Sequence, residues 1–166
     1  MIRPKREALT AAAFAGYGDV VEVPDTGGRL INGGTAWRHD GMAALALERD
    51  GGRALLSFFR VQPARLPLRC TQLERHPVST QLFLPLGARP FLVVVARGEH
   101  APDPATLRFF VTNGRQGVNY APGTWHHPTL ALDEVTDFLV LGREDTRPGD
   151  NCDELPFADG AVFELT

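Results

Sequence analysis

The residues best suited to chemistry are concentrated in residues 117–128, which read Gly-Val-Asn-Tyr-Ala-Pro-Gly-Thr-Trp-His-His-Pro. The Pro-Gly pair predicts a turn, because proline suits its first corner and glycine tolerates the positive φ of the second. Two adjacent histidines follow, and the side chains of a strand alternate between its faces. We therefore expect His126 to face a site inside the fold, and His127 either to support that site or to donate a proton from its rim.

A second polar cluster, residues 74–81, reads Glu-Arg-His-Pro-Val-Ser-Thr-Gln. Glu74 and His76 share a face if the segment is extended, and Gln81 follows after a proline turn. With His126 from another strand, these groups can hold a divalent cation such as Ni, Mn, Fe or Zn, because imidazole, carboxylate and amide oxygen are suitable ligands. Alternatively, the groups hydrogen-bond one another in a polar barrel mouth and bind a substrate without a metal.

Four other residues are candidates for acting on a substrate or binding it. Tyr120 is either a core tyrosine with its hydroxyl bound to the backbone or a proton shuttle. Trp125 either belongs to the core or a cavity wall, or serves as a recognition platform. Asn119 is a candidate for substrate binding. Arg60 ends an apolar segment and is either a surface charge or a fork for a substrate carboxylate.

A glycine-rich segment, residues 25–34, has the composition of a loop. It contains Asn32, and Arg38 follows shortly after it. The segment is either an exposed connection or a lid that carries these two residues to a site. His39 and His100 lie in polar loops and are expected to be solvated.

These groups need a scaffold, and the chain predicts one made of many short strands. Glycine and proline turns separate short apolar segments, which is typical of an antiparallel sandwich or barrel. The Gly51-Gly52 turn favours a hairpin that joins residues 43–48 to residues 53–60. Strands are expected over residues 19–23, 43–48, 53–60, 66–68, 70–74, 80–83, 91–96, 107–112, 129–132 and 138–141.

The two ends of the chain depart from this pattern. Residues 10–15 predict a short helix, which Thr10 caps and Gly16 ends. After Gly142 the chain becomes polar, and we expect an exposed tail whose last apolar residues pack across the barrel or onto a partner subunit. These apolar residues are Phe157, Val162 and Phe163. A single domain is expected over residues 1–166.

Composition argues against several classes of protein. The chain has 166 residues and a net charge of -3, so a face that binds nucleic acid or an anionic membrane is not expected. Lys5 is the only lysine, and Cys70 and Cys152 form no CxxC, so neither a Schiff-base site nor a disulfide framework is expected. The sequence has no apolar run typical of a signal peptide or of a membrane span of about 20 residues, so we expect a soluble, cytoplasmic protein.

The spacing of the two clusters resembles that of the cupin barrels, whose motifs are H-x-H-x(3,4)-E-x(6)-G and G-x(5)-P-x-G-x(2)-H. The corresponding segments here are Glu74-x-His76-x(4)-Gln81-x(5)-Gly87 and Gly117-x(4)-Pro122-Gly-x-Trp125-His126. Glu74 replaces one expected histidine, Gln81 replaces the expected glutamate, and the second motif is compressed. The implied fold is mainly β, a cupin-like antiparallel β-barrel or jelly roll with a short N-terminal helix.

A longer resemblance covers nearly the whole chain. The blocks that carry it are Gln116-Gly-Val-Asn-Tyr-Ala-Pro-Gly-Thr-Trp-His-His-Pro, Leu73-Glu-Arg-His-Pro, Thr80-Gln-Leu-Phe-Leu-Pro, Phe110-Val-Thr-Asn-Gly and Asp150-Asn-Cys-Asp. They are similar to the ureidoglycolate lyase family, formerly called ureidoglycolate hydrolase. The resemblance implies a cupin fold, a homodimer, and cleavage of ureidoglycolate to glyoxylate and urea in allantoin and purine degradation.

The resemblance also implies roles for the candidate residues. The acid–base candidates are His126, Tyr120, His127 and Glu74, and either Tyr120 or His127 would protonate the departing urea. The candidates for substrate binding are Arg60, Asn32, Arg38, Asn119 and Trp125. The candidate metal ligands are Glu74, His76, Gln81 and His126, for Ni, Mn or Zn or for no metal at all.

Two other functions are compatible with the same residues. Another cupin enzyme, such as a dioxygenase or a sugar epimerase, would share the barrel. A non-catalytic cupin would bind a small carboxylate without converting it.

Overall fold

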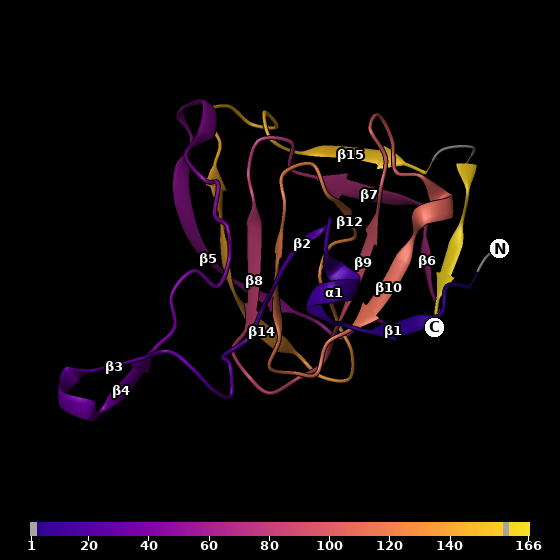
Figure 1. The fold of residues 1–166 in the computed structure, drawn as a ribbon. Helices are drawn as coiled ribbons and strands as arrows, with labels where there is room; N and C mark the ends of the chain where they lie inside the picture. The colour runs from indigo at the N-terminus through magenta and orange to yellow at the C-terminus, as the bar shows by residue number, and fades with distance from the viewer. Residues whose placement is uncertain (1–2, 158–159) are drawn as a thin grey trace.

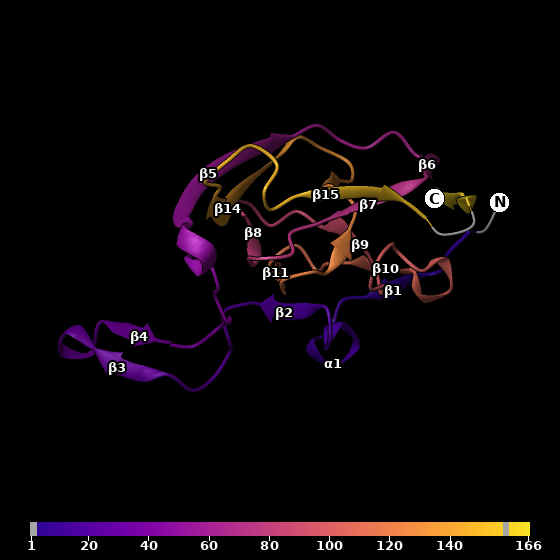
Figure 2. The ribbon, with the colours of Figure 1, turned by 90° about the horizontal axis from the view of Figure 1, so that it is seen from above.

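The structure, a computed structural model, describes residues 3–157 and 160–166. Two β-sheets face each other and enclose the core (Figures 1 and 2). Sheet 1 has the order β1 (Arg6–Ala8), β10 (Arg108–Val111), β9 (Phe91–Ala96), β12 (Trp125–His126), β7 (Gln72–Arg75) and β15 (Asp153–Pro156), with β13 (Leu130–Ala131) also on β9. Sheet 2 has the order β2 (Gly18–Val21), β11 (Gly117–Tyr120), β8 (Gln81–Pro85), β14 (Thr136–Glu144) and β5 (Arg53–Val61).

The other elements flank these sheets. They are α1 (Ala11–Phe14), the pair β6 (Leu68–Cys70) and β16 (Phe163–Leu165), the pair β3 (Arg29–Ile31) and β4 (Ala36–Arg38), and the short 3₁₀ turns η1 (Asn32–Gly34), η2 (Arg49–Gly51) and η3 (Pro104–Thr106). Except for β1 with β10, the strand pairs are antiparallel. The prediction of a mainly β, cupin-like fold with a short N-terminal helix is therefore confirmed. No helix of the described residues is long and apolar enough to cross a membrane.

The core between the sheets is built from aromatic and β-branched side chains. Strand β9 is buried along its whole length, because its sequence Phe-Leu-Val-Val-Val-Ala offers apolar side chains to both faces. Phe91 meets Phe138 of β14 edge-on, with ring centroids 4.9 Å apart, and this contact joins the two sheets. Phe14 brings α1 onto the same core, and the expected helix cap is confirmed because Thr10 Oγ1 accepts the Ala13 N–H.

Residues 43–48 do not form the expected strand, so the predicted hairpin is wrong. The backbone of this segment is bound elsewhere: the Ala44 N–H donates to Asp19, and the Ala46 N–H donates to Thr80 Oγ1. An alternating Ala-Leu pattern suits a strand, but it does not specify which groups will satisfy the backbone. Strand β5 consequently pairs with β14 on one side and has no second partner among the described strands.

The segment after Gly142 adopts one of the two expected arrangements, since its polar residues 144–150 are largely exposed and its last apolar residues pack across the barrel. Strand β15 pairs with β7 and β16 pairs with β6, so the chain packs back across its own barrel. Phe157 and Phe163 are buried in the core, with ring centroids 4.9 Å apart. The apolar residues of the segment therefore decide its position, in spite of its many charges.

One buried arginine accounts for several of those charges. Arg143 donates to the carboxylates of Asp145 and Asp150, and also to the backbone carbonyls of Arg49 and Asp50. A buried guanidinium is tolerable only when its donors are satisfied in this way. The interaction holds the end of β14 against the turn that precedes β5.

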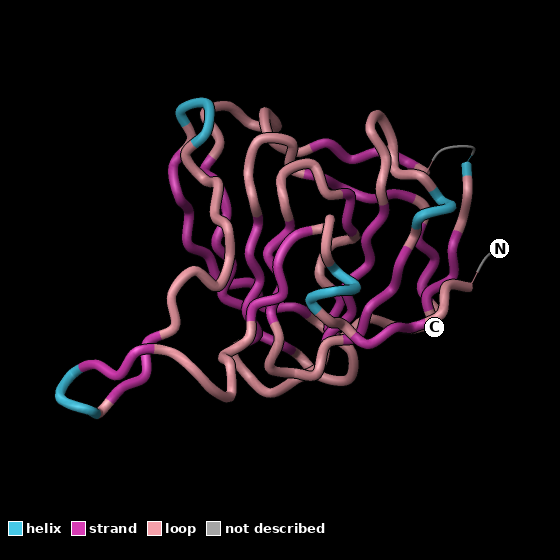
Figure 3. Tube along the Cα trace, in the orientation of Figure 1, coloured by secondary structure: helices cyan, strands magenta, loops and turns pink. Residues whose placement is uncertain are grey.

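The hairpin of β3 and β4 projects from the body (Figures 1 and 3). We call residues 29–38 the arm. Its two strands pair with each other, and among the described strands they have no other partner. The side chains of Leu30 and Trp37 are register partners on the arm, and the two residues are 49% and 64% exposed.

The burial of the C-terminal segment leads to a prediction about stability. Replacing Phe163 by Ala should lower the free energy of unfolding by about 3–5 kcal/mol, because it leaves a cavity in the core. Leu86→Ala is the matched control, since Leu86 is exposed and should change stability little. Urea denaturation measures both variants, and equal, small effects would contradict the packing described here.

Candidate active site

Two neighbouring strands of sheet 1 bring a carboxylate and two imidazoles together. Glu74 on β7 and His126 on β12 are register partners, so their side chains leave the sheet on the same face. Glu74 Oε1 lies 3.4 Å from His126 Nε2, and the centroids of the His76 and His126 rings are 5.4 Å apart. One ligand atom from each of the three residues lies within 4.8 Å of the others, which is close enough to hold one metal ion.

A backbone carbonyl orients each of these histidines. His76 Nδ1 lies 2.7 Å from the carbonyl oxygen of Asn151, and His126 Nδ1 lies 2.8 Å from that of Thr124. A carbonyl can only accept, so each Nδ1 carries the hydrogen and each Nε2 keeps its lone pair. Both Nε2 atoms are buried, and no described residue forms a hydrogen bond with them. Histidines that ligate metals are commonly held in this way.

Gln81 supplies a fourth donor atom, from sheet 2. Its Oε1 is buried and, within the described ranges, has no hydrogen-bond partner. Buried polar atoms are nearly always bonded, so unpartnered atoms on His76, on His126 and on Gln81, whose side chain lies beside His76, require an explanation. Two imidazole nitrogens, a carboxylate and an amide oxygen suit a divalent cation, and the cluster therefore fits a metal.

Two members of the cluster border a cavity of about 110 Å³ between the inner face of β5 and the segment after β14, whereas Glu74 and His126 do not line it. His76 and Gln81 belong to its lining, as do Ser57 and Phe59 of β5. Alternate residues of β5 reach this cavity because successive side chains of a strand point to opposite faces. Arg143 also lines the cavity, but its donors are already used by Asp145, Asp150 and two carbonyls.

The electrostatics favour the ligand forms of these groups. Burial raises the pKa of Glu74, but His126, His76 and His127 together outweigh it and hold that pKa below its usual value. The pKa of His76 is lowered, first by burial and then by the neighbouring His126. Near neutral pH, Glu74 is therefore ionised and His76 is neutral, and these are the states in which both bind a cation.

Tyr120 forms one wall of the cluster. Its ring stacks on that of His126, with centroids 4.1 Å apart and an interplanar angle of 14°. Burial raises the pKa of Tyr120 far above its usual value, so the hydroxyl stays protonated.

His127 lies near the cluster, whereas Asn119 and Trp125 face away from it. His127 Nδ1 is 2.9 Å from the Pro128 carbonyl oxygen, and burial lowers the pKa of its imidazole. Asn119 faces the other side of sheet 2 from Tyr120 and donates to Asp19 and to the Ala44 carbonyl. Trp125 is fully buried, and its indole N–H donates to the Gly98 carbonyl. The last two therefore hold neighbouring loops in place.

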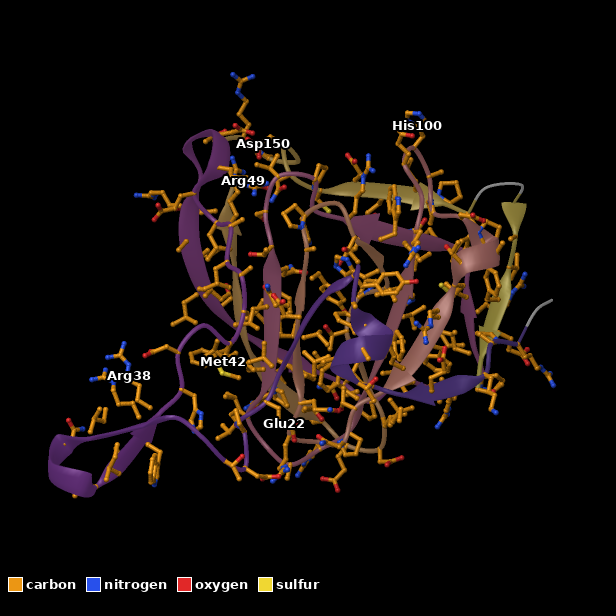
Figure 4. The ribbon with its side chains drawn as sticks, in the orientation of Figure 1. Glu22, Arg38, Met42, Arg49, His100 and Asp150 are labelled. Atoms are coloured by element: carbon orange, nitrogen blue, oxygen red, sulfur yellow. The ribbon has the colours of Figure 1, made fainter. Side chains whose placement is uncertain are left out.

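The structure does not bring Arg60, Arg38 or Asn32 to the cavity of the same chain. Arg60 lies on the outer face of β5, where it forms a two-pronged ion pair with Asp137, and its side chain is 72% exposed. Asn32 and Arg38 lie on the arm, where Arg38 pairs with Asp40. Figure 4 shows Arg38 pointing into solvent, well away from the barrel.

A family model described as ureidoglycolate lyase matches residues 1–164. The chain belongs to the ureidoglycolate lyase family. A ureidoglycolate lyase of Burkholderia cepacia is 47% identical over 152 residues, covering 90% of this chain and 84% of that protein. One of Burkholderia mallei (strain NCTC 10229) is 50% identical over 137 residues, covering 82% and 80%. A dTDP sugar isomerase of Desulfovibrio desulfuricans G20 aligns in three dimensions with a TM-score of 0.46 and 14% identity, covering 86% of this chain and 83% of that one.

Asn151 is the residue of this ureidoglycolate lyase family member that sequence reasoning missed. Its carbonyl orients His76, its Oδ1 accepts the Val78 N–H, and its Nδ2 donates to Ser79 Oγ. The sequence feature that could have indicated a role for Asn151 is the Asp-Asn-Cys-Asp block, which is one of the blocks that carry the family resemblance. The surrounding charges indicated a solvated tail, and for that reason no role was assigned.

The position of Asn151 leads to a second prediction. Asn151→Ala should cost about 1–3 kcal/mol of unfolding free energy, because it removes the partner of the buried Val78 N–H. It should also change the NMR signal of the His76 Nδ1 proton, since the carbonyl that binds it is then less firmly held. Asn113→Ala is the control, because the Asn113 side chain likewise accepts backbone N–H groups but lies in a loop away from His76. An unchanged His76 signal in Asn151→Ala would contradict the role given to Asn151.

Proposed function

We propose that this chain is an enzyme, a ureidoglycolate lyase, that cleaves ureidoglycolate to glyoxylate and urea. The observation that carries the proposal is the buried cluster of Glu74, His76 and His126, with two imidazole nitrogens left unpartnered among the described residues, in a member of this family. A carboxylate and two oriented imidazoles beside a cavity are suited to acid–base chemistry on a small polar substrate.

The reaction requires two proton transfers and no covalent intermediate. One carbon of ureidoglycolate carries a carboxylate, a hydroxyl and the ureido nitrogen. The hydroxyl loses its proton and its oxygen forms the carbonyl of glyoxylate, while the electron pair of the C–N bond leaves with the nitrogen. That nitrogen gains a proton and departs as urea. One base and one acid are therefore sufficient.

The chain offers a group for each step. Glu74 is kept ionised by its imidazole neighbours and is the base for the hydroxyl proton. Tyr120 keeps its proton and stacks directly on His126, so it is the donor to the leaving nitrogen, and His127 is the alternative donor. His126 and His76 offer Nε2 lone pairs at the cluster, which can accept the hydrogen bond of the substrate hydroxyl.

The same cluster fits a divalent metal. Glu74, His76, Gln81 and His126 would hold Ni, Mn or Zn, because their unpartnered or ionised donor atoms suit such an ion. A bound cation would acidify the substrate hydroxyl and stabilise the alkoxide that forms from it.

Substrate recognition and physiology complete the proposal. Arg60, Arg38 and Asn32 are candidates for binding the substrate carboxylate, and Asn119 and Trp125 for supporting the walls of the site. The reaction would serve allantoin and purine degradation in the cytoplasm, and the enzyme would be a homodimer. These assignments are supported by the family to which the chain belongs.

The proposed activity can be tested directly with two histidine variants. The purified protein should release urea and glyoxylate in equal amounts from ureidoglycolate. His126→Ala should lower kcat/KM on the order of 10²–10⁴-fold, because it removes an acid–base or ligand group. His100→Ala should leave the rate unchanged, since His100 lies at the tip of an exposed loop (Figure 4). Release of ammonia in place of urea would point to a different reaction, and a normal rate in His126→Ala would exclude His126 from the mechanism.

Metal removal provides an independent test. After chelation and verified loss of bound metal, urea release should fall and should return on addition of Ni or Mn. His76→Ala should bind the added ion more weakly by equilibrium dialysis, because one ligand is lost. Full activity after verified metal removal would contradict the metal role while leaving the lyase assignment intact.

A further inference from the structure

A second group of metal-ligating side chains lies beside the first, where β15 runs along β7 (Figures 1 and 2). Glu154 on β15 is the register partner of Glu74 on β7, so both carboxylates leave the sheet on the same face. Cys152 directly precedes β15, and its thiol is free. One ligand atom from each of these three residues lies within 4.8 Å of the others. A sulfur and two carboxylates therefore meet at the edge of sheet 1.

The two carboxylates face each other, and the neighbouring arginine does not lie between them. Like charges that are directly opposed across a strand pair destabilise the pair. Arg75 follows Glu74 on β7, but it leaves the sheet on the opposite face, where it pairs with Asp153 and lies over the ring of Trp125. A divalent cation bound between the two carboxylates would remove their repulsion.

A buried lone pair gives independent evidence that Glu74 faces a position suited to a cation. His126 is 1% exposed, and its Nε2, which has no hydrogen-bond partner among the described residues, lies 3.4 Å from Glu74 Oε1. Because Nδ1 carries the hydrogen, Nε2 and the carboxylate oxygen are both acceptors, and they repel each other unless a positive charge lies between them. A carboxylate has two oxygens, so an ion on the His126 side leaves the second oxygen for an ion on the Cys152 side.

The donor atoms of the second group select the class of cation. Thiolate sulfur prefers soft or borderline ions, whereas sites built from oxygen alone suit Mg, Ca or Mn. Zn²⁺ accepts both kinds of ligand, at about 2.3 Å from sulfur and about 2.0–2.2 Å from carboxylate oxygen. Glu154 is exposed, so its side chain can rotate to bring the three donors onto one ion. Water would complete the tetrahedral arrangement.

The second group is connected to the proposed chemistry in two ways. Cys152 lines the cavity of about 110 Å³ together with His76. Glu74, the proposed base, belongs to both groups of ligands. An ion held by Glu74 and its two neighbours would occupy a lone pair of the carboxylate and lower its basicity. The carboxylate would then accept the hydroxyl proton of a substrate less readily.

We propose that Glu74, Cys152 and Glu154 form a second site for a thiophilic divalent cation of the Zn²⁺ class, and that its occupation inhibits the enzyme by withdrawing Glu74 from proton transfer. The thiol loses its proton to water as the bond between zinc and sulfur forms, and no oxidant or reductant takes part. The site differs from the first cluster because it has a sulfur ligand and no imidazole. The inhibitory effect rests on the proposed function, whereas the binding of the ion does not.

Cobalt absorption tests the site without reference to activity. Co²⁺ can replace Zn²⁺ in such sites, and a thiolate bound to Co²⁺ gives a charge-transfer band in the near ultraviolet. Titration of the wild type should produce this band, and Cys152→Ser should lose it. Glu154→Gln, at an exposed position, should need at least about 10-fold more Co²⁺ for half-saturation, because one ligand is lost.

Two control variants identify the thiolate that binds. Cys70→Ala should keep the band, because Cys70 is 1% exposed and packs among apolar side chains of a separate core cluster. His76→Ala should also keep it, since the first cluster contains no sulfur. Absence of the band in the wild type, its survival in Cys152→Ser, or an unchanged Co²⁺ affinity in Glu154→Gln would overturn the site.

Inhibition is measured as urea release from enzyme loaded with Ni or Mn. Zn²⁺ added in excess should lower the rate of the wild type. The Zn²⁺ concentration that halves the rate should be at least about 10-fold higher for Cys152→Ser, with each protein compared with its own rate without zinc. Equal sensitivity of the two proteins would overturn the inhibitory role, because zinc would then act elsewhere. A wild type that releases no urea would instead overturn the proposed function, while the cobalt band would still decide the second site, so the two failures are distinguishable.

Discussion

The hydrogen bonds from two histidine Nδ1 atoms to backbone carbonyls are the interactions on which the site depends. They fix the tautomer of His76 and of His126 and leave both Nε2 lone pairs free of hydrogen bonds to the described residues, with His126 Nε2 3.4 Å from Glu74 Oε1. The carbonyls are themselves held in place: the Thr124 hydroxyl donates to Tyr17, and the Asn151 side chain binds the turn after β7. The two Nε2 atoms are therefore oriented only while the loops that carry the Thr124 and Asn151 carbonyls are correctly packed. The geometry of the site thus depends on the folding of segments that are distant in the sequence.

The same arrangement explains why charge can persist in a buried place. A carboxylate removed from water would normally take up a proton, because burial penalises its charged form. Three imidazoles around Glu74 reverse that tendency. Tyr120 lies in the same environment but lacks such partners, so its proton is retained. Burial therefore leaves an ionised carboxylate and a protonated hydroxyl near one imidazole, and these are the states that the proposed base and the proposed acid need.

Local pattern predicted much of the scaffold and the pair of Glu74 and His76, but it could not specify long-range partners. The continuous apolar run of β9, the cap at Thr10 and the two-residue spacing of Glu74 and His76 are local signals, and the first two are confirmed. The hairpin over residues 43–48 was wrong because its backbone bonds to Asp19 and Thr80, which no periodicity reveals. Asn151 was missed because its sequence neighbours are charged. Its burial depends on the pairing of the following strand, β15, with β7, which is distant in the sequence.

The arm is the part of the chain that the folding of one copy does not explain. Among the described strands, none packs on its apolar face, its two arginines oppose each other, and Leu56 and Phe58 on β5 are also exposed. Arginines opposed across a strand pair repel each other, and an isolated hairpin is at best marginally stable in water. The conformation of the arm therefore depends on its own strand pairing, whereas the barrel is held by the side chains packed between its two sheets.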